Sequence, residues 1–487
     1  MALKGVHLGF ALTVSMTACA GPLGTPDASS DVVADAPNDA IVASDVEATP
    51  ESGPPPVRML RYVPQGCAHT VRTPPRAMGL VQGDRGTLGP SPMPRAVHVN
   101  FAAAPQTTAA FLWNTDPQTL ASVVEYGTAP DRLDQNAVGH VMTVGPVERV
   151  TTHEVHVCDL RPNTTYYYRV GGSSAFSQVQ SFRTAPDSAL APVSFAFCGD
   201  SRGDVMVWQQ VNEAIARQSG MRQPDALLFT GDAVDIGLIQ TEWDGWFRGA
   251  RNTLATMPFV MAHGNHEGLA VNYLSQFAQP QTDSDLQSEM FFSMDYGPVH
   301  LVVLNDTGSG NLQEILENTE RVWLEADLQR AESRRAQVPW IVVMHHKGAF
   351  SSASHTDDAD TAIIRRVWAP IFARFHVDAV LNGHDHHFEL THPLDGAGAP
   401  VVAPAYGVTY VTAAASGAPL YGRNVTQPWT RTLQRTVNFG LLRASKTSLQ
   451  LDGFRVDEAG LPSAIVDSCV HIERDTDGSA PTHRPCI

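Results

Sequence analysis

The sequence has too little positive charge for a protein that binds nucleic acids. Its 487 residues include 33 Lys and Arg against 50 Asp and Glu, which leaves a formal net charge of -17. Phosphate backbones attract basic surfaces, so this balance predicts no nucleic-acid-binding surface. Residues 20–56 contain no aromatic residue, no Lys and no Arg, but several Asp and Glu. Such a segment cannot bury enough apolar surface to offset its chain entropy, so we expect residues 20–57 to form a disordered linker.

Long apolar runs are also scarce. Beyond the first 19 residues, no stretch is long and apolar enough to cross a membrane. Residues 1–19 combine an early lysine, a short apolar stretch and small residues, as an export signal does. Its end, "SMTAC", resembles the lipobox of bacterial lipoproteins, in which Cys19 would carry lipid; a plain secretory signal is the alternative. We expect an exported protein, periplasmic or at the cell surface, that touches the outer membrane only through this anchor.

Cysteines are few, and their number bears on disulfide pairing. There are six: Cys19, Cys67, Cys158, Cys198, Cys469 and Cys486. If Cys19 carries lipid, five remain, and at least one thiol stays unpaired. Cys198 lies in an apolar run and is expected to be a small buried core residue. We expect Cys469 to pair with Cys486, because a bridge there would hold the polar C-terminal tail; the sequence does not fix the connectivity.

The remaining chain divides into two patterns. Residues 58–94 are rich in Pro and Gly and predict an irregular segment. Residues 95–186 form short β-type runs with turn signals between them, which predicts a β-sandwich. In residues 190–475, strands alternate with helical patterns, which predicts an α/β domain whose functional site lies beyond the carboxyl ends of its strands. Residues 476–487 are predicted to be a tail.

Five apolar runs of the α/β domain each end in a short polar cluster. These clusters are "CGDSRGD", "TGDAVD", "HGNHEG", "VVMHH" and "NGHDHH". Sheet geometry would bring them to one edge, where carboxylate, amide and imidazole groups suit Zn, Mn or Fe. Two such ions can activate a water and stabilise the attacking and leaving oxygens of a phosphoryl transfer. The sequence therefore predicts a dinuclear metal centre.

In this order, the five motifs resemble those of the calcineurin-like metallophosphoesterases. The preceding sandwich, with the segment "LRPNTTYYYRV" similar to fibronectin type III domains, resembles the purple acid phosphatase branch. The resemblance implies a four-layer α/β/β/α catalytic domain with two metal ions. It implies a phosphatase that hydrolyses small phosphomonoesters by attack of a metal-bound hydroxide. The metal ligands that it implies are Asp200, Asp232, Asn265, His345, His384 and His386, with Asp232 shared by both ions.

The resemblance also assigns roles near the substrate. His266 would protonate the leaving oxygen or hold the phosphate, and His355 is a candidate histidine on the substrate side. Arg202 could hold a substrate phosphate; pairing with Asp204 or another acid is the alternative. The chain departs from the family at Asp235, where purple acid phosphatases have a tyrosine, and in "DSR", which lacks the histidine of other relatives. Asp235 could be a ligand or a cap.

Two other functions fit the same sequence. One is a phosphodiesterase of the same fold, and the other is a surface lipoprotein that binds a ligand without turnover. The complete ligand set favours an enzyme. The substrate, the metal pair and the oligomeric state stay open.

Overall fold

A computed structural model describes most of the chain. The described residues are 61–72, 80–144, 150–268, 270–282, 289–307, 315–402, 406–422, 425–475, 481–484 and 486. The predicted signal segment 1–19 with Cys19 and the linker 20–57 lie outside these residues. Within the described ranges, no helix is long and apolar enough to span a membrane.

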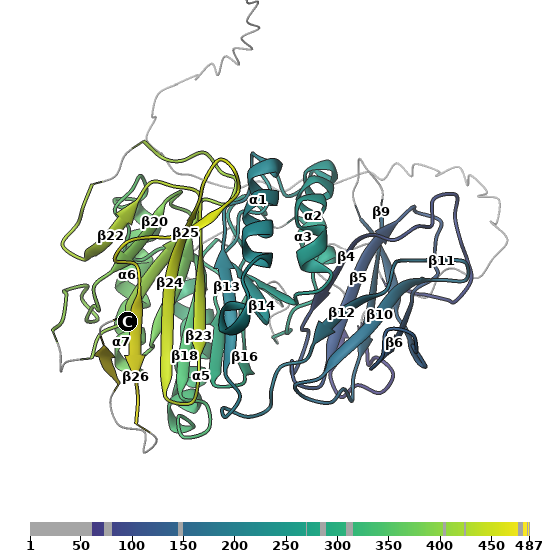
Figure 1. Cartoon of the computed structure of the whole chain (residues 1–487), viewed down its shortest axis with the longest axis horizontal. Helices are drawn as coiled ribbons and strands as arrows, with labels where there is room; N and C mark the ends of the chain where they lie inside the picture. Colours follow the sequence, from purple (N-terminus) through teal and green to yellow (C-terminus); the bar gives the residue numbers. More distant parts are fainter. Residues whose placement is uncertain are drawn as a thin grey trace, which may run out of the picture. The chain divides into compact units, whose positions relative to one another are not determined.

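A β-sandwich forms between Val81 and Arg183, as predicted (Figure 1). Its first sheet has the order β3 (Val81–Gln82), β8 (His140–Val144), β9 (Val150–Val157), β5 (Ala109–Thr115) and β4 (Arg95–Asn100). Its second sheet has the order β11 (Ala175–Phe176), β10 (Thr165–Gly172), β6 (Val123–Gly127) and β7 (Gln135–Val138), and β12 (Gln180–Arg183) also pairs with β10. Strand β3 lies in the segment predicted to be irregular. A separate pair, β1 (Arg61–Tyr62) and β2 (Val71–Arg72), precedes the sandwich.

Alternating inward side chains form the core of the sandwich. Phe111 and Trp113 from one sheet pack with Tyr168 and Phe182 from the other. The hydroxyl of Tyr166 accepts a hydrogen bond from the backbone N–H of Arg161 at 3.0 Å. This is the tyrosine that closes a corner in fibronectin-like sandwiches.

Two mixed sheets form the centre of the α/β domain. The first has the order β15 (Phe259–Met261), β14 (Ala226–Phe229), β13 (Val193–Cys198), β23 (Asn438–Ala444), β24 (Ser448–Val456), β26 (Val470–Glu473) and β27 (Thr482–Arg484), with β25 (Pro462–Ala464) on β24. The second has the order β16 (Phe292–Tyr296), β17 (Val299–Val303), β18 (Trp340–Lys347), β19 (Ala379–Gly383), β21 (Thr409–Ala413), β20 (Phe388–Thr391) and β22 (Thr430–Gln434). Strands β13, β14 and β15 are parallel to one another, and so are β17, β18, β19 and β21.

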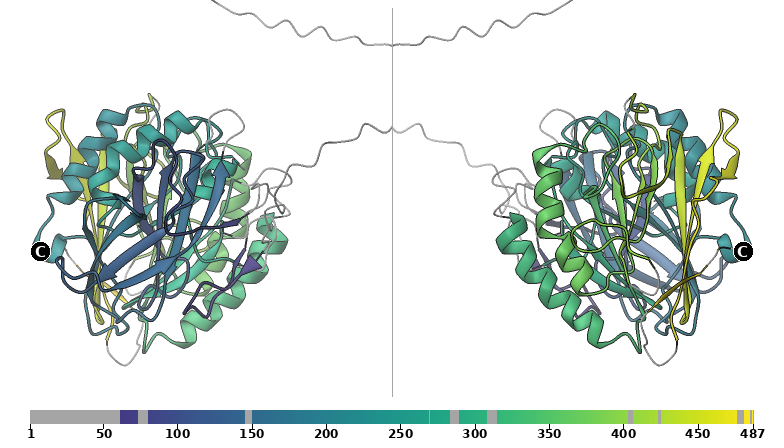
Figure 2. Two further views of the ribbon diagram at one scale, coloured as in Figure 1. Left: turned by 90° about the vertical axis from the view of Figure 1, so that its right-hand side faces the viewer. Right: turned by 90° about the vertical axis from the view of Figure 1, so that its left-hand side faces the viewer.

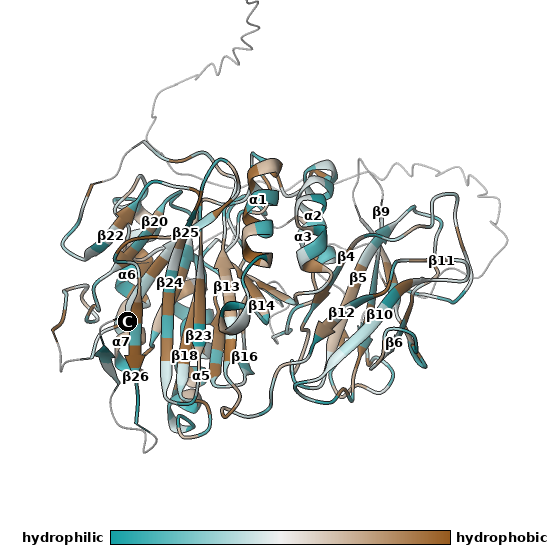
Figure 3. Cartoon of the chain, in the orientation of Figure 1, coloured by the Kyte–Doolittle hydropathy of each residue, from teal (hydrophilic) through white to brown (hydrophobic). Residues whose placement is uncertain are grey.

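Helices cover the outer face of each sheet and complete the predicted four layers. The helices α1 (Val205–Ala216), α2 (Gln240–Leu254) and α3 (Val271–Gln276) pack on the first sheet. The helices α5 (Arg321–Ser333), α6 (Ala359–Val367) and α7 (Ala369–Arg374) pack on the second. Figure 2 shows the layers nearly edge-on, with helices on both outer sides. A third apolar core fills the space between the sheets, and Figure 3 shows the apolar residues along their strands.

The described residues contain two disulfides. Cys469 bonds to Cys486, as predicted, and Cys67 bonds to Cys158. Cys198 is buried and unpaired, also as predicted, and burial raises the pKa of its thiol to about 12. Residues 482–484, from the predicted tail, form β27 and pair with β26. Strand β27 therefore extends the first sheet, and the Cys469–Cys486 disulfide joins the residue before β26 to the chain after β27.

Candidate active site

The polar clusters predicted from the sequence lie where parallel strands of both sheets end. Asp200 follows β13, Asp232 follows β14, and Asn265 follows β15 on the first sheet, while His384 follows β19 on the second. Asp200, Asp232 and His384 have φ angles of 54°, 58° and 71°. A left-handed conformation costs a non-glycine residue on the order of 1–3 kcal/mol and is concentrated at functional sites. Each of these side chains is thus turned back toward the edge where the two sheets meet.

A glycine precedes each of Asp200, Asp232, Asn265 and His384. Most of these glycines allow a neighbouring segment to approach closely and have an ordinary φ angle. A Cβ atom on Gly264 would lie 2.2 Å from the backbone nitrogen of Asp232. Gly231 is the exception among the four glycines that precede these residues, because its φ is +97°. Larger side chains at either position would push the β14 and β15 loops apart.

One group of donors forms what we call the second cation position: Asp232, Asn265, His346 and His384. Donor atoms of Asp232, His346 and His384 all lie within 4.8 Å of one another. His346 Nε2 is 3.4 Å from Asp232 Oδ1 and 3.0 Å from Asn265 Oδ1. Asp232 is 1% exposed, whereas Asn265 is exposed and leaves the group open to solvent.

The structure places His346 in this group and turns the predicted ligand His345 away. Along β18, even-numbered residues face the core between the sheets and odd-numbered residues face the helix layer. His345 therefore points toward α7, where its Nδ1 donates to Asp306 Oδ2 at 2.8 Å and its Nε2 accepts from Asn382 at 3.2 Å. The structure thus brings His346, and not the predicted His345, to the other donors.

A second group forms the first cation position: Asp200, Asp232 and His386, with Asp235 at its rim. His386 Nε2 lies 3.5 Å from Asp200 Oδ1, and Asp200 accepts the backbone N–H of His384 at 3.0 Å. Asp200 is fully buried. Arg202 extends its guanidinium into this group and pairs with Asp235 at 2.9 Å. The sequence had left its partner open, with Asp204 as one choice; Asp204 instead caps the start of α1.

Backbone carbonyls fix the orientation of three of the histidines. The Nδ1 atoms of His266, His346 and His386 donate to the carbonyl oxygens of Asp235, Thr230 and Pro419 at 2.7–2.8 Å. A carbonyl can only accept, so each ring must carry its proton on Nδ1. Each Nε2 is thereby directed at the carboxylates, which is how partners outside the ligand set orient a metal-binding imidazole.

The negative charge of the buried carboxylates at the second position favours a bound cation. Burial disfavours the charged form of His346, but the carboxylates around it, that of Asp232 foremost, raise its pKa to about 10. Both ring nitrogens of His346 face oxygen atoms, an arrangement that suits a protonated imidazole. Burial and the charge of His346 hold the pKa of His384 well below its usual value, which leaves His384 as a neutral donor. A metal ion at this position would replace the proton on His346 Nε2.

His266 lies at the mouth of the site. Its backbone N–H donates to Asp232 Oδ1 at 2.9 Å, and its Nε2 is 3.8 Å from Asp232 Oδ2. Its side chain is 30% exposed, so Nε2 is open to a substrate on one side. This position agrees with the predicted role at the substrate.

His355 and Tyr421 form the opposite wall. The His355 ring lies 4.0 Å from that of His384, and its Nε2 is 3.2 Å from the Tyr421 hydroxyl. Tyr421 stacks on His386 at 4.0 Å, with 15° between the ring planes. His355 is held from behind by Asp358 at 2.7 Å. The structure thus brings the predicted His355 to the site and adds Tyr421, which lies in a loop without any sequence motif.

Glu267 supports the site from beneath, and the sequence had assigned it no role although it belongs to the "GNHE" motif. Its carboxylate accepts the backbone N–H groups of Asp232, Ala233 and Gly264 at 2.6–3.0 Å. Burial, and then the charge of Asp232, raise the pKa of Glu267 to about 8. These three bonds tie the loop after β14 to the loop after β15.

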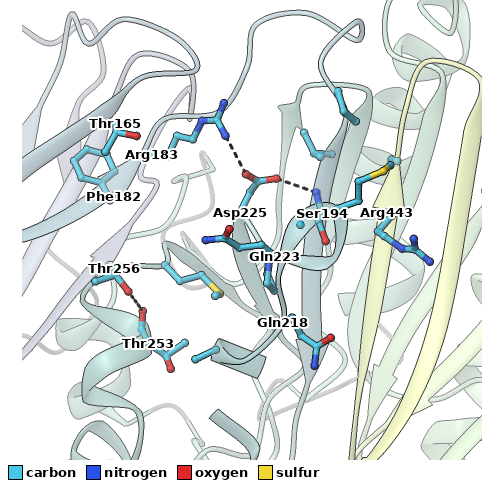
Figure 4. Close-up of a pocket in the computed structure, with 18 of the residues that line it drawn as sticks. Thr165, Phe182, Arg183, Ser194, Gln218, Gln223, Asp225, Thr253, Thr256 and Arg443 are labelled. Atoms are coloured by element: carbon cyan, nitrogen blue, oxygen red, sulfur yellow. Dashed lines mark hydrogen bonds and ion pairs between the residues drawn. The ribbon is translucent and has the colours of Figure 1, made fainter. Parts of the chain in front are cut away.

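A large cavity lies elsewhere (Figure 4). It measures about 630 Å³ and lies between the sandwich and the starting ends of β13 and β14. In it, Asp225 accepts the N–H of Ser194 at 2.9 Å and lies 3.9 Å from Arg183. None of the donors of either cation position lines it. A smaller cavity of about 300 Å³ borders Arg202 and Asp235 instead.

Comparison with known proteins agrees with this arrangement. Residues 94–184 match the family described as "Purple acid Phosphatase, N-terminal domain", and residues 193–388 match "Calcineurin-like phosphoesterase". Purple acid phosphatase 21 of Arabidopsis thaliana is 29% identical over 69% of this chain and 74% of its own. Acid phosphatase type 7 of Homo sapiens is 27% identical over 64% of this chain and 74% of its own.

A solved structure shares the fold. The purple acid phosphatase PPD1 from yellow lupin seeds superimposes with a TM-score of 0.63 and 16% sequence identity, over 79% of this chain and 75% of that one. The sandwich, the four-layer domain and the ordered motifs agree with these matches. The chain belongs to the calcineurin-like phosphoesterases, in the purple acid phosphatase branch.

Proposed function

We propose that the protein is an exported, metal-dependent phosphatase that hydrolyses phosphomonoesters. The main observation in favour is the convergence of two buried carboxylates, an amide and several imidazoles at the ends of five strands. The family acts on phosphoric ester bonds, and relatives are named acid phosphatases. The family name leaves the choice between a monoester and a diester open, and the names of the relatives favour the monoester.

The donor groups fit divalent metal ions such as Zn, Mn or Fe. The second position would hold an ion through Asp232, Asn265, His346 and His384. Asp200, Asp232 and His386 are the donors of the first position, as in the two-ion centre expected from the sequence. Oxygen and imidazole ligands of this kind suit borderline divalent cations. A bound ion would supply a Lewis acid for a phosphoryl oxygen and lower the pKa of a water molecule.

The protein's own residues would orient the ester and supply a proton. His266 Nδ1 is committed to a carbonyl, so only Nε2 can exchange a proton with the substrate. In the protonated ring, Nε2–H would donate to the leaving oxygen as the phosphorus–oxygen bond breaks, and a neutral ring with its proton on Nδ1 would remain. General acid catalysis of this kind contributes roughly 10²–10⁴-fold. His355 and the Tyr421 hydroxyl are placed to bind the phosphate or the leaving group from the opposite wall.

Two disulfides support an oxidising compartment. Cys67–Cys158 and Cys469–Cys486 are the kind of bridges that persist in exported proteins and are rare in reducing ones. Attachment through lipid at Cys19 is part of the same proposal. The expected partner is a small phosphorylated substrate.

Removal of metal tests the function. After treatment with EDTA and desalting, hydrolysis of 4-nitrophenyl phosphate is expected to fall at least ~100-fold, because the donors cannot replace the charge that an ion supplies. Mn or Zn should restore it. Bis(4-nitrophenyl) phosphate serves as the paired diester substrate, and faster turnover of it than of the monoester would reassign the reaction. Full activity in metal-free protein would contradict metal dependence.

A further inference from the structure

The guanidinium of Arg202 lies inside the first cation position. Its Nη1 is 2.9 Å from Asp235 Oδ1, its Nε is 3.6 Å from Asp232 Oδ2, and its Nη2 is 3.5 Å from His386 Nε2. Three nitrogens of one side chain therefore face three different residues that could bind a metal ion. Two of these donors, Asp232 and His386, are the ones expected to bind a metal ion there, and Asp235 stands where the family has a tyrosine ligand.

The backbone holds Arg202 in this place. The N–H groups of Ser201 and Arg202 both donate to the carbonyl oxygen of Asp232, at 3.0 and 3.3 Å. Gly203, with a φ of +90°, then turns the chain away toward α1. The root of the side chain is thus bonded to the loop that carries Asp232, so the guanidinium is directed inward by the fold.

Burial and charge agree with a fixed role. The Arg202 side chain is 16% exposed, and Asp232 is 1% exposed. Burying carboxylates without a cation is costly, and arginine supplies a positive charge that it does not lose in proteins. Among the described residues, Arg202 Nε is buried without a hydrogen-bond partner, although the Asp232 carboxylate is near. The guanidinium therefore has an unused donor directed at the shared carboxylate.

A metal ion at the first position and this guanidinium would compete for the same two ligand atoms. An ion bound to His386 Nε2 and Asp232 would lie roughly 2.0–2.2 Å from each of them. The guanidinium nitrogens already lie 3.5 and 3.6 Å from the same two atoms. Two cations so close would repel each other strongly, because little water separates them. The second position is different, since none of the contacts of Arg202 reaches Asn265, His346 or His384.

We propose that Arg202 is a built-in cation that takes the place of the first metal ion, so that the chain holds one divalent ion tightly, at the second position. The inference rests on the proposed function for the identity of the second position and changes the expected number of tightly bound ions from two to one. Arg202 then neutralises the shared carboxylate and also binds the substrate directly, because it presents N–H groups to a phosphoryl oxygen. A metal enters the first position only where Arg202 moves out.

Metal counting on matched variants tests this inference. The full chain is stripped with EDTA, titrated with Mn or Zn by calorimetry, desalted and analysed for metal. The wild type is expected to retain one ion per chain. In Arg202→Met, which keeps most of the side-chain length but removes the charge, a second ion should bind at least ~10-fold more tightly than in the wild type. Arg248→Met, on the wall of the same small cavity, is the control and should behave as the wild type does.

Three outcomes would overturn the inference. The first is retention of two ions by the wild type. The second is an affinity for a second ion in folded Arg202→Met that equals that of the wild type. The third is a rise in this affinity in Arg248→Met as large as in Arg202→Met. If Arg202→Met does not fold, the metal content of the wild type decides the question: one retained ion per chain supports the inference, and two retained ions overturn it. Hydrolysis of 4-nitrophenyl phosphate by the same samples separates the two proposals: a protein that binds one ion and hydrolyses neither test ester would refute the function and leave the role of Arg202 supported.

Discussion

Asp232→Ala is expected to abolish hydrolysis and to release the bound metal ion. Asp232 faces donors from both cation positions and is almost fully buried, so no other side chain can replace it. Loss of an outer partner of a metal ligand typically costs 10–100-fold in activity or affinity, and loss of this shared ligand should cost more than that. The measurement is the turnover of 4-nitrophenyl phosphate, together with metal content after desalting.

The control for this substitution is Asp225→Asn. Asp225 is a partly buried carboxylate near the start of β14, beside the large cavity of Figure 4 and away from the metal donors. Burial raises its pKa, so a neutral amide is a mild change. The control should retain metal and activity. An Asp232→Ala protein that is folded and still holds its ion would show that Asp232 is not a ligand.

The neighbouring histidines of β18 should differ in their effect on metal binding. His346→Ala is expected to reduce hydrolysis and metal binding by more than ~100-fold, because it removes a ligand of the second position. It also leaves the buried Asp232 without its imidazole partner, so the free energy of unfolding should fall by about 1–3 kcal/mol. His345→Ala should keep metal and lower the free energy of unfolding by about 1–3 kcal/mol, because it leaves the buried Asp306 without its imidazole hydrogen bond. Metal analysis and urea unfolding measure the two effects.

A milder substitution guards against loss of the folded protein. His345→Gln retains an amide that can donate to Asp306 and should bind metal as the wild type does. Loss of metal in folded His345→Gln, with retention in His346→Ala, would restore His345 as the ligand and refute the side-chain directions described here.

Much of the site could be predicted because the strands that lead into it are fully buried. An apolar run that ends in a polar pair, as before Asp200 and Asp232, allows little choice of where the pair must lie. The choice between His345 and His346 was harder. Alternation along β18 places Trp340, Val342 and Met344 between the sheets, but the register of the strand shifts between Met344 and Lys347. The contacts of the folded strand therefore decide which histidine faces the site.

Other features depend on contacts that no local pattern contains. Arg202 pairs with Asp235, 33 residues away, whereas the sequence named Asp204 or another acid as its partner. Tyr421 reaches the site from a loop after β21, where no periodicity constrains the side chain. The pairing of Cys67 with Cys158 spans 91 residues, so only the folded arrangement of the chain brings the two thiols together. In each case a long-range contact decided the position.

The most direct test is anomalous diffraction from a crystal of the full chain soaked in manganese. The central claim is that the ends of distant strands converge to hold a cation at Asp232, Asn265, His346 and His384. The predicted result is a strong anomalous peak within bonding distance of all four side chains. A crystal that contains manganese elsewhere, with no density among these four residues, would contradict the claim.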